Sequence, residues 1–85
     1  MEDIEDIKNY FKYVSPVGIF VIQYDYNESK WSLGINNTVH GLYSTPIAAA
    51  DDVFCQTTGY YEWDSFDTIK IITPTDVYQW EKYKR

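Results

Sequence analysis

Residues 18–35, GIFVIQYDYNESKWSLGI, decide the fold that the sequence predicts. The first nine of them are rich in β-branched and aromatic residues, which favour an extended strand. The next four, Asn-Glu-Ser-Lys, are typical of a turn. After the turn, Trp31, Leu33 and Ile35 alternate with small or polar residues, which is the pattern of a strand with one buried face. We therefore predict a β-hairpin here.

Two neighbouring segments extend this hairpin. Residues 39–43 predict a short third strand, with Gly41 at a bulge or a bend. Residues 2–14 predict a helix, because apolar residues recur along one helical face, at positions 4, 7, 11 and 14. Acidic residues crowd its first turn, where the helix dipole favours them. Pro16 ends this helix, because proline disfavours the helical conformation in the preceding residue.

A second helix is predicted from Pro46 to about residue 56. Thr45 is a good N-cap, and proline suits the first helical position because that N–H would be unpaired anyway. Gly59 is predicted to stop the helix in a left-handed conformation. We expect Asp51 and Asp52 to face water. The predicted core-facing side chains are Ile47, Ala50, Val53 and Phe54.

The remaining segment carries three shorter predictions. Residues 60–67 alternate aromatic and acidic side chains and predict a loop or a twisted edge strand. Residues 68–72 predict a short strand. Residues 74–83 predict a third helix that begins at a proline and turns Val77 and Trp80 inward.

The predicted element order is therefore α-β-β-(β)-α-β-α. A chain of 85 residues supports one domain, residues 1–85. The predicted fold class is α+β, with a small, mainly antiparallel sheet of three or four strands packed against two or three helices.

The charge of the chain restricts its partners. It carries 13 acidic and 7 basic residues, a net charge of -6. Direct binding to nucleic acid or to an anionic membrane depends on Lys and Arg, so this balance argues against both. It favours a larger protein with a basic surface. The alternative is that the charge only keeps a tyrosine-rich protein in solution.

Aromatic residues are unusually abundant. The chain has nine Tyr, four Phe and three Trp, and a domain of this size buries a modest share of its surface. We expect some rings to remain at the surface among carboxylates, as in a contact surface.

Catalytic and metal-binding patterns are weak. His40 is the single imidazole and Cys55 the single thiol, and we expect Cys55 to be a small core residue near a helix end. One His and one Cys cannot build a structural zinc site. Carboxylates could gather around Mg²⁺ or Ca²⁺, but they lack EF-hand spacing and favour a solvated acidic surface. We therefore predict no enzyme activity and no cofactor.

The acidic and aromatic stretch after the second helix is the candidate binding site. Rings give contact area at low entropy cost, and carboxylates steer basic partners. Trp63 and Phe66 have an alternative reading as core residues, which we favour for Trp63. The predicted partner-binding residues are Asp51, Asp52, Tyr60, Tyr61, Glu62, Asp64 and Asp67.

Several features predict a cytoplasmic protein that does not enter a membrane. The longest apolar run, residues 17–22, is far shorter than the roughly 20 residues that a membrane span needs. The start of the chain is acidic, the reverse of a secretory signal. One cysteine cannot form an internal disulfide and fits a reducing compartment.

Residues 42–46 (LYSTP), 48–53 (AAADDV), 58–59 (TG) and 63–64 (WD) resemble a pattern in short uncharacterised bacterial and phage proteins. In size and acidity the chain is also similar to phage-encoded inhibitors of bacterial defence, including anti-CRISPR proteins. That resemblance implies an inhibitor that acts by binding.

The leading hypothesis is a small acidic inhibitor that occludes a basic surface of a larger complex that handles nucleic acid. The carboxylates would stand in for phosphates, and the rings would anchor the contact. A homo-oligomer that traps a small ligand such as a nucleotide is one alternative. An accessory or immunity-type subunit encoded beside its partner is another.

Overall fold

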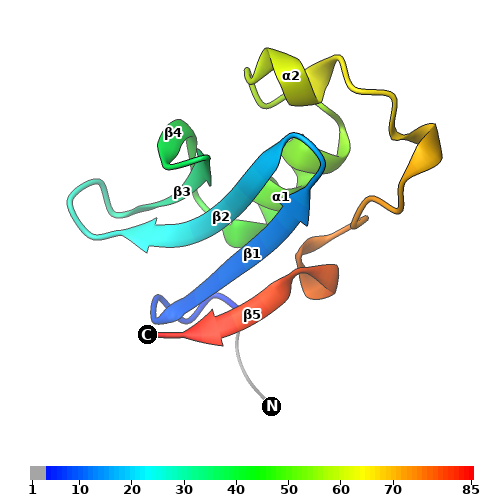
Figure 1. Cartoon of the computed structure of the whole chain (residues 1–85). Coiled ribbons are helices and arrows are strands. Elements are labelled where there is room, and N and C mark those ends of the chain that lie inside the picture. Colours follow the sequence, from blue (N-terminus) through cyan, green and yellow to red (C-terminus); the bar gives the residue numbers. More distant parts are fainter. Residues whose placement is uncertain (1–3) are drawn as a thin grey trace.

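The computed structural model describes residues 4–85, which form a five-stranded antiparallel sheet with helical segments on one side (Figure 1). The strand order is β4-β3-β2-β1-β5, so β2 is the central strand. The strands are β1 (Asn9–Ser15), β2 (Gly18–Asp25), β3 (Lys30–Ile35), β4 (Thr38–Tyr43) and β5 (Glu81–Lys84). The helical segments are α1 (Pro46–Phe54), α2 (Tyr61–Asp64) and the 3-10 turns η1 (Thr68–Lys70) and η2 (Val77–Gln79).

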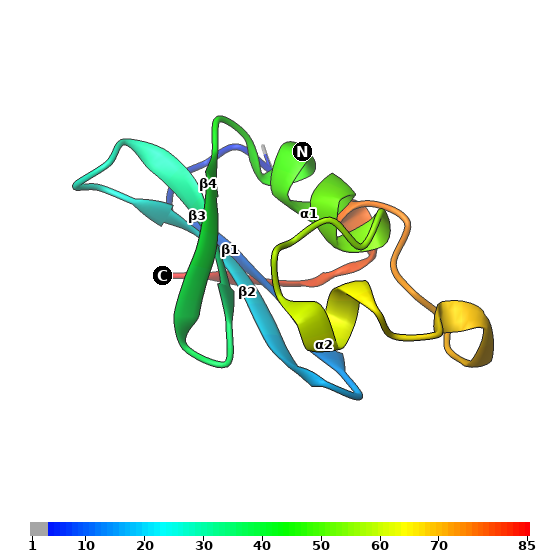
Figure 2. The same ribbon diagram turned by 90° about the horizontal axis from the view of Figure 1, so that it is seen from above.

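The core lies between the sheet and the layer that holds α1 and α2 (Figure 2). Alternate residues of the strands point into it, as the period of two in a strand requires. All three tryptophans belong to it. Its buried members are Phe11, Phe20, Ile22, Trp31, Leu33, Ile35, Ala49, Ala50, Val53, Trp63, Val77 and Trp80.

The predicted central hairpin is confirmed. β2 and β3 pair in register from Phe20 opposite Ile35 to Asp25 opposite Lys30. Asp25 closes the turn with its own side chain, because Oδ1 accepts hydrogen bonds from the backbone N–H groups of Asn27 and Glu28. The predicted third strand is also confirmed, as β4.

β4 contains the predicted bulge, one residue away from its expected place. Leu33 pairs with Gly41 and Gly34 pairs with Val39, so His40 is the extra residue. Gly41 has a different role. A Cβ there would lie 2.8 Å from the Tyr43 hydroxyl, so the lack of a side chain lets the Tyr43 ring pass over the backbone.

The predicted helix over residues 2–14 is wrong. Residues 9–15 form β1, which pairs with β2 on one side and β5 on the other, and residues 4–8 form turns. In the strand, Phe11 faces the core and Val14 faces away from it, so the apolar spacing does not mark one face. Pairing with β2 over residues 10–15 and with β5 over residues 9–12 satisfies backbone groups that a helix would have satisfied, and it overrides local spacing. The acidic residues at positions 2 and 3 lie outside the described residues.

Two predictions nearer the C-terminus are also wrong. Residues 68–72 contain the turn η1 instead of a strand, and residues 74–83 contain η2 and the strand β5 instead of a helix. Asp76 acts as the cap of η2 and accepts a hydrogen bond from the Tyr78 N–H. Val77 and Trp80 do turn inward, as predicted.

The predicted fold class is corrected accordingly. Within residues 4–85 the sheet has five strands, and α1 is the single helix longer than four residues, where two or three helices were predicted. The segments of β1 and β5 have helical spacing and were predicted as helices, which accounts for the difference in the number of helices and strands. No helix in this described part of the chain has the length and apolar content to cross a membrane.

Candidate functional site

The candidate site lies on the layer formed by α1 and α2, and α1 begins as predicted. Thr45 is extended and its Oγ1 accepts a hydrogen bond from the Ala48 N–H at 3.1 Å, with Pro46 in the first turn. The predicted inward face is partly wrong. Ala49, Ala50 and Val53 are buried, but Ile47 and Phe54 are 40% and 46% exposed.

The end of α1 also differs from the prediction. The helix ends at Phe54, and Gln56 takes the left-handed conformation with φ of 56°. Gly59 is left-handed as well, but it lies in the turn before α2. The Gln56 side chain holds that turn in place, because its Nε2 donates to the carbonyl groups of Trp63 and Phe66 at 2.8 and 2.6 Å.

Within residues 60–67, predicted as a loop or an edge strand, residues 61–64 form the short helix α2 and the rest is irregular, as in a loop. Trp63 fixes α2 in place. The Trp63 side chain is wholly buried, which confirms the reading of it as a core residue. Its ring contacts Phe20 at a centroid distance of 5.1 Å, and its Nε1 donates to the Val53 carbonyl at 2.8 Å. This one anchor joins α2 to both α1 and the sheet.

Asp64, a predicted binding residue, has an internal role. Its Oδ1 accepts hydrogen bonds from the N–H and the hydroxyl of Thr58 at 3.0 and 2.8 Å. Its Oδ2 accepts from the Gly59 N–H at 2.8 Å. Three such bonds to a carboxylate hold the turn between the helices, so Asp64 is a structural residue.

Asp52 also serves the fold. Its Oδ2 accepts a hydrogen bond from the Tyr43 hydroxyl at 2.7 Å, and its Oδ1 accepts one from Thr57 at 3.1 Å. Burial, together with the Asp52 carboxylate and the more remote charge of Asp64, raises the pKa of Tyr43 well above its usual value.

The other predicted residues differ in how far they reach into solvent. Asp51 and Glu62 are exposed, and Tyr61 is 77% exposed. Asp67 is exposed and caps η1 by accepting a hydrogen bond from the Ile69 N–H. Tyr60 is half-buried, with its hydroxyl donating to the Val17 carbonyl and its ring edge-on to His40.

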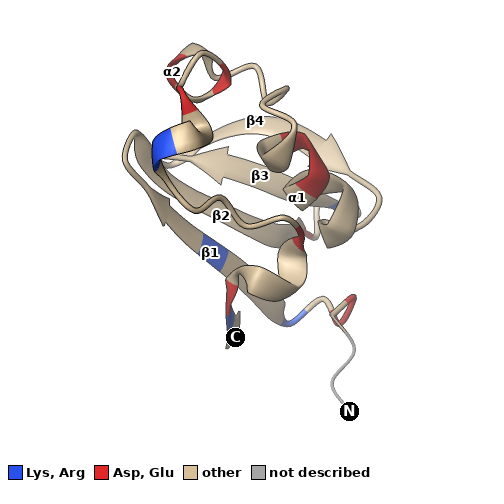
Figure 3. Cartoon of the chain, turned by 90° about the vertical axis from the view of Figure 1, so that its right-hand side faces the viewer, with Lys and Arg blue, Asp and Glu red and all other residues tan. Residues whose placement is uncertain are grey.

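We call the exposed residues of this set, Asp51, Tyr61, Glu62 and Asp67, the α1–α2 surface. Figure 3 shows acidic segments on both α1 and α2. Residues 31–69 contain five acidic residues and no Lys or Arg, and Lys70 follows in η1, so the layer that carries this surface is mainly negative. An exposed ring among free carboxylates is suited to a basic protein surface, where the ring supplies buried area and the charges supply steering.

Cys55 and His40, the two residues weighed for nucleophilic catalysis, lie in different surroundings. Cys55 is exposed, where a core position was predicted, and no hydrogen bond joins it to His40 within residues 4–85. His40 instead contacts the Tyr60 ring at a centroid distance of 5.2 Å. No group of three or more potential metal-ligating side chains gathers in these residues.

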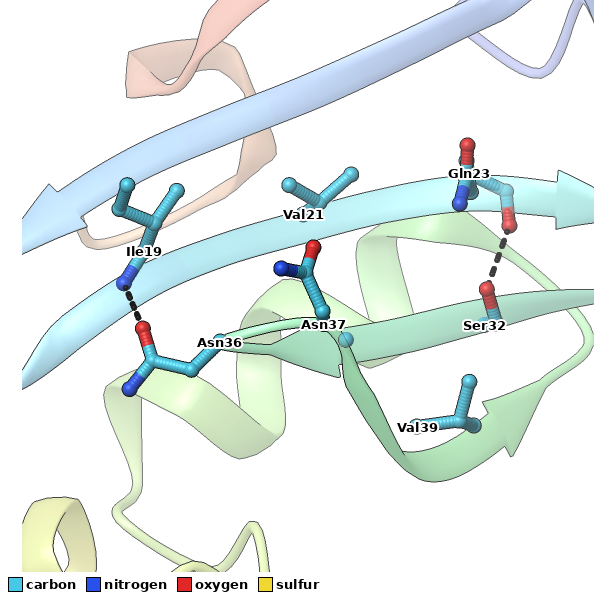
Figure 4. A pocket seen from close by; sticks show the side chains of 8 residues that line it. Ile19, Val21, Gln23, Ser32, Asn36, Asn37 and Val39 are labelled. Carbon is cyan, nitrogen blue, oxygen red and sulfur yellow. Dashed lines mark hydrogen bonds between the residues drawn. The ribbon is translucent and has the colours of Figure 1, made fainter.

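The sequence analysis missed a second feature, on the opposite face of the sheet. An open pocket of about 440 Å³ lies over β2, β3 and β4 (Figure 4). Gly34 and Ser32 form part of its lining, with Ile19, Val21 and Val39 around them. The signal was present in the sequence, because residues 19–22 are continuously apolar, as is typical of a strand covered on both faces.

Comparison of the chain with models of known families, with curated proteins and with solved structures finds no match. The resemblance to phage-encoded inhibitors therefore stays a prediction from size and acidity.

Proposed function

We propose that this protein is a small non-enzymatic binding protein that docks on a basic surface of a larger protein through the α1–α2 surface. The observation that supports this is the excess of negative charge in that layer, where five carboxylates occur over residues 31–69 and Lys70 in η1 is the first basic residue after them. Tyr61 is the anchor, because its ring is 77% exposed and lies beside Glu62.

The proposed partner is a protein with a groove for nucleic acid, whose basic side chains accept carboxylates in place of phosphates. The interaction takes place in the cytoplasm, a proposal supported by the single, exposed cysteine. The nucleotide-binding alternative has less support, because no basic or aromatic residue lines the open pocket.

Some of these carboxylates can be replaced without removing an internal hydrogen bond, and others cannot. Asp52 and Asp64 accept internal hydrogen bonds, so reversing their charge would disturb the fold as well as any contact. Asp51 and Glu62 are exposed. Glu28, exposed in the turn between β2 and β3, supplies a matched charge reversal far from the α1–α2 surface.

The test is affinity capture from host cells with the tagged protein, followed by mass spectrometry and a salt titration of whatever is bound. We expect wild type and Glu28→Lys to retain a basic partner that added salt releases. Asp51→Lys, Glu62→Lys and Tyr61→Ala should lose it, because a charge or anchor at the centre of a contact contributes about 1–3 kcal/mol or more. A partner that binds all variants equally would refute this function.

A further inference from the structure

The sheet has one face that its own chain leaves open. Along the central strand β2, Phe20 and Ile22 are wholly buried under α1 and α2, while Ile19 and Val21 point to the opposite side. None of the helical segments in residues 4–85 covers that side (Figure 2). A continuous apolar run is typical of a strand that is buried on both faces, and here only one face is buried.

Neighbouring strands add apolar residues to this open face. Val14 on β1 lies opposite Ile19 and is 58% exposed. Val39 and Leu42 on β4 are 59% and 42% exposed. Both point outward because His40 is the extra residue between them, so the pairs Gly34–Val39 and Ser32–Leu42 keep the same orientation.

The open face carries almost no net charge. Its polar residues near the centre, Gln23 and Ser32, are neutral, and the Ser32 hydroxyl donates to the Gln23 carbonyl at 3.2 Å. Toward β5, Lys12 lies directly opposite Glu81, and opposite charges at such a pair offset each other. The face thus contrasts with the negative α1–α2 surface on the other side of the molecule.

We infer that the open face binds the same face of a second copy, so that two sheets stack with their helical layers outward. The open face is defined by Val14, Ile19, Val21, Val39 and Leu42 around Gly34. Each copy carries a charge of -6, and this orientation places the acidic layers on opposite outer sides. They are then separated by the thickness of two molecules whose shortest extent is 17 Å.

That separation exceeds the Debye length of about 8 Å at physiological ionic strength, so repulsion between the acidic layers is largely screened. Any arrangement that brings the α1–α2 surfaces together would be opposed by the same charges. A basic partner gains little from the open face, because its carboxylates are already paired. Glu81 lies opposite Lys12, and Asp25 lies opposite Lys30 and accepts hydrogen bonds within its own turn. The charge distribution therefore favours a second copy here and a different, basic partner on the other side.

The size of the chain is compatible with a dimer interface on this face. The two longer extents of the chain are 32 and 27 Å. Their product sets an upper limit on the footprint that is close to the roughly 800 Å² that a standard protein interface buries on each side. Stacked sheets lie about 10 Å apart, so side chains of one copy can fill the pocket over Gly34 in the other.

Sedimentation of the protein across about a hundredfold range of concentration tests the inference. We expect a dimer that dissociates on dilution. Ile19→Glu and Val39→Glu should each weaken it at least about tenfold, because a buried unpaired carboxylate costs more than 1.4 kcal/mol. Ile72→Glu is the control, since Ile72 is 95% exposed in the segment between η1 and η2 and should leave the dimer intact.

Gly34→Val distinguishes loss of the dimer from loss of the fold, because this variant should fold and still dimerise more weakly. A Cβ at residue 34 meets nothing closer than the Val21 carbonyl at 3.8 Å, and valine favours a strand. This variant should be at least as resistant to unfolding as wild type, yet a weaker dimer because the pocket is filled. A monomeric wild type at the highest concentration would refute the inference.

The effects of the two glutamate variants also show whether the two copies are joined in a different way. If Val39→Glu dissociated the dimer and Ile19→Glu did not, the copies would be joined through the edge of β4, and stacking would be wrong. Failure of the proposed function is distinguishable from failure of this inference. Glu62→Lys should abolish capture of the basic partner without changing sedimentation, and Ile19→Glu should do the reverse.

Discussion

The two faces of the sheet are built from similar apolar side chains but have different surroundings. The covered face meets α1 and α2 and holds the tryptophan-rich core, whereas the open face meets solvent and is nearly uncharged. Of the acidic residues of α1 and α2, Asp51 and Glu62 are exposed on the covering layer. Folding therefore depends on one face, and the proposed contacts use the outside of the helical layer and the other face of the sheet. Changes at one set of residues should leave the other set intact.

The largest expected difference is between two isoleucines on β2. Ile22→Ala should lower the free energy of unfolding by about 2–5 kcal/mol, because Ile22 is wholly buried and truncation leaves a cavity. Ile19→Ala should lower it by less than about 1 kcal/mol, since Ile19 is already 44% exposed. Urea denaturation at a concentration where the protein is monomeric measures both. Equal losses would mean that the open face also supports the monomer.

A smaller difference is expected between two acidic residues of α2. Asp64→Ala should lower the free energy of unfolding by about 1–3 kcal/mol, because the donors of Thr58 and Gly59 lose their acceptor. Glu62→Ala should change it by less than about 0.5 kcal/mol, as is usual at an exposed position. Thermal unfolding followed by circular dichroism compares them. A large loss in Glu62→Ala would show that the α1–α2 surface is needed for folding.

The smallest expected effect is a dependence on alkaline pH through Tyr43. Burial and the hydrogen bond to Asp52 raise the pKa of Tyr43 in the folded state above its unfolded value of 10.0. Because the folded pKa is the higher one, this stabilisation is complete below about pH 10 and is lost as pH rises through the folded pKa. Tyr43→Phe should cost about 0.5–1.5 kcal/mol at neutral pH.

The same variant should lose less stability than wild type between neutral pH and about pH 11, because it lacks that ionisation. Urea midpoints at the two pH values give the measurement. Tyr13→Phe is a useful comparison, because burial alone raises the pKa of Tyr13. Among the described residues, no carboxylate accepts a hydrogen bond from the Tyr13 hydroxyl. An identical alkaline loss in wild type and Tyr43→Phe would exclude Tyr43 as the responsible group.

The parts of the fold that were predictable from sequence are those with local signals. Alternation and turn residues predicted β2, β3 and β4, and the threonine and proline at 45 and 46 predicted the start of α1. β1 and β5 were not predictable in this way. Their segments carry helical spacing. β1 pairs with the adjacent β2, and β1 and β5 pair with each other from opposite ends of the chain.

The sequence predicted which residues make up the candidate site, but not which of them bind within the fold and which are free to bind a partner. Sequence alone placed Asp51, Asp52, Glu62 and Asp64 on one surface. It could not show that Asp52 and Asp64 are held by internal donors, because Tyr43 and Thr58 are brought to them by the tertiary fold. Some aromatic side chains stay at the surface, as expected from their number. Tyr26, Tyr61 and Tyr78 are more than half exposed.

The bulge in β4 has a consequence for mutations that shorten the chain. In a regular strand, removing one residue turns every side chain beyond it to the opposite face. His40 is already the unpaired residue, so deleting it should convert the ladder between Leu33 and Gly34 into an uninterrupted one. Val39 and Leu42 would keep their orientation, and the loss would be confined to the ring contact with Tyr60. This strand can therefore absorb a single-codon deletion that its neighbours could not.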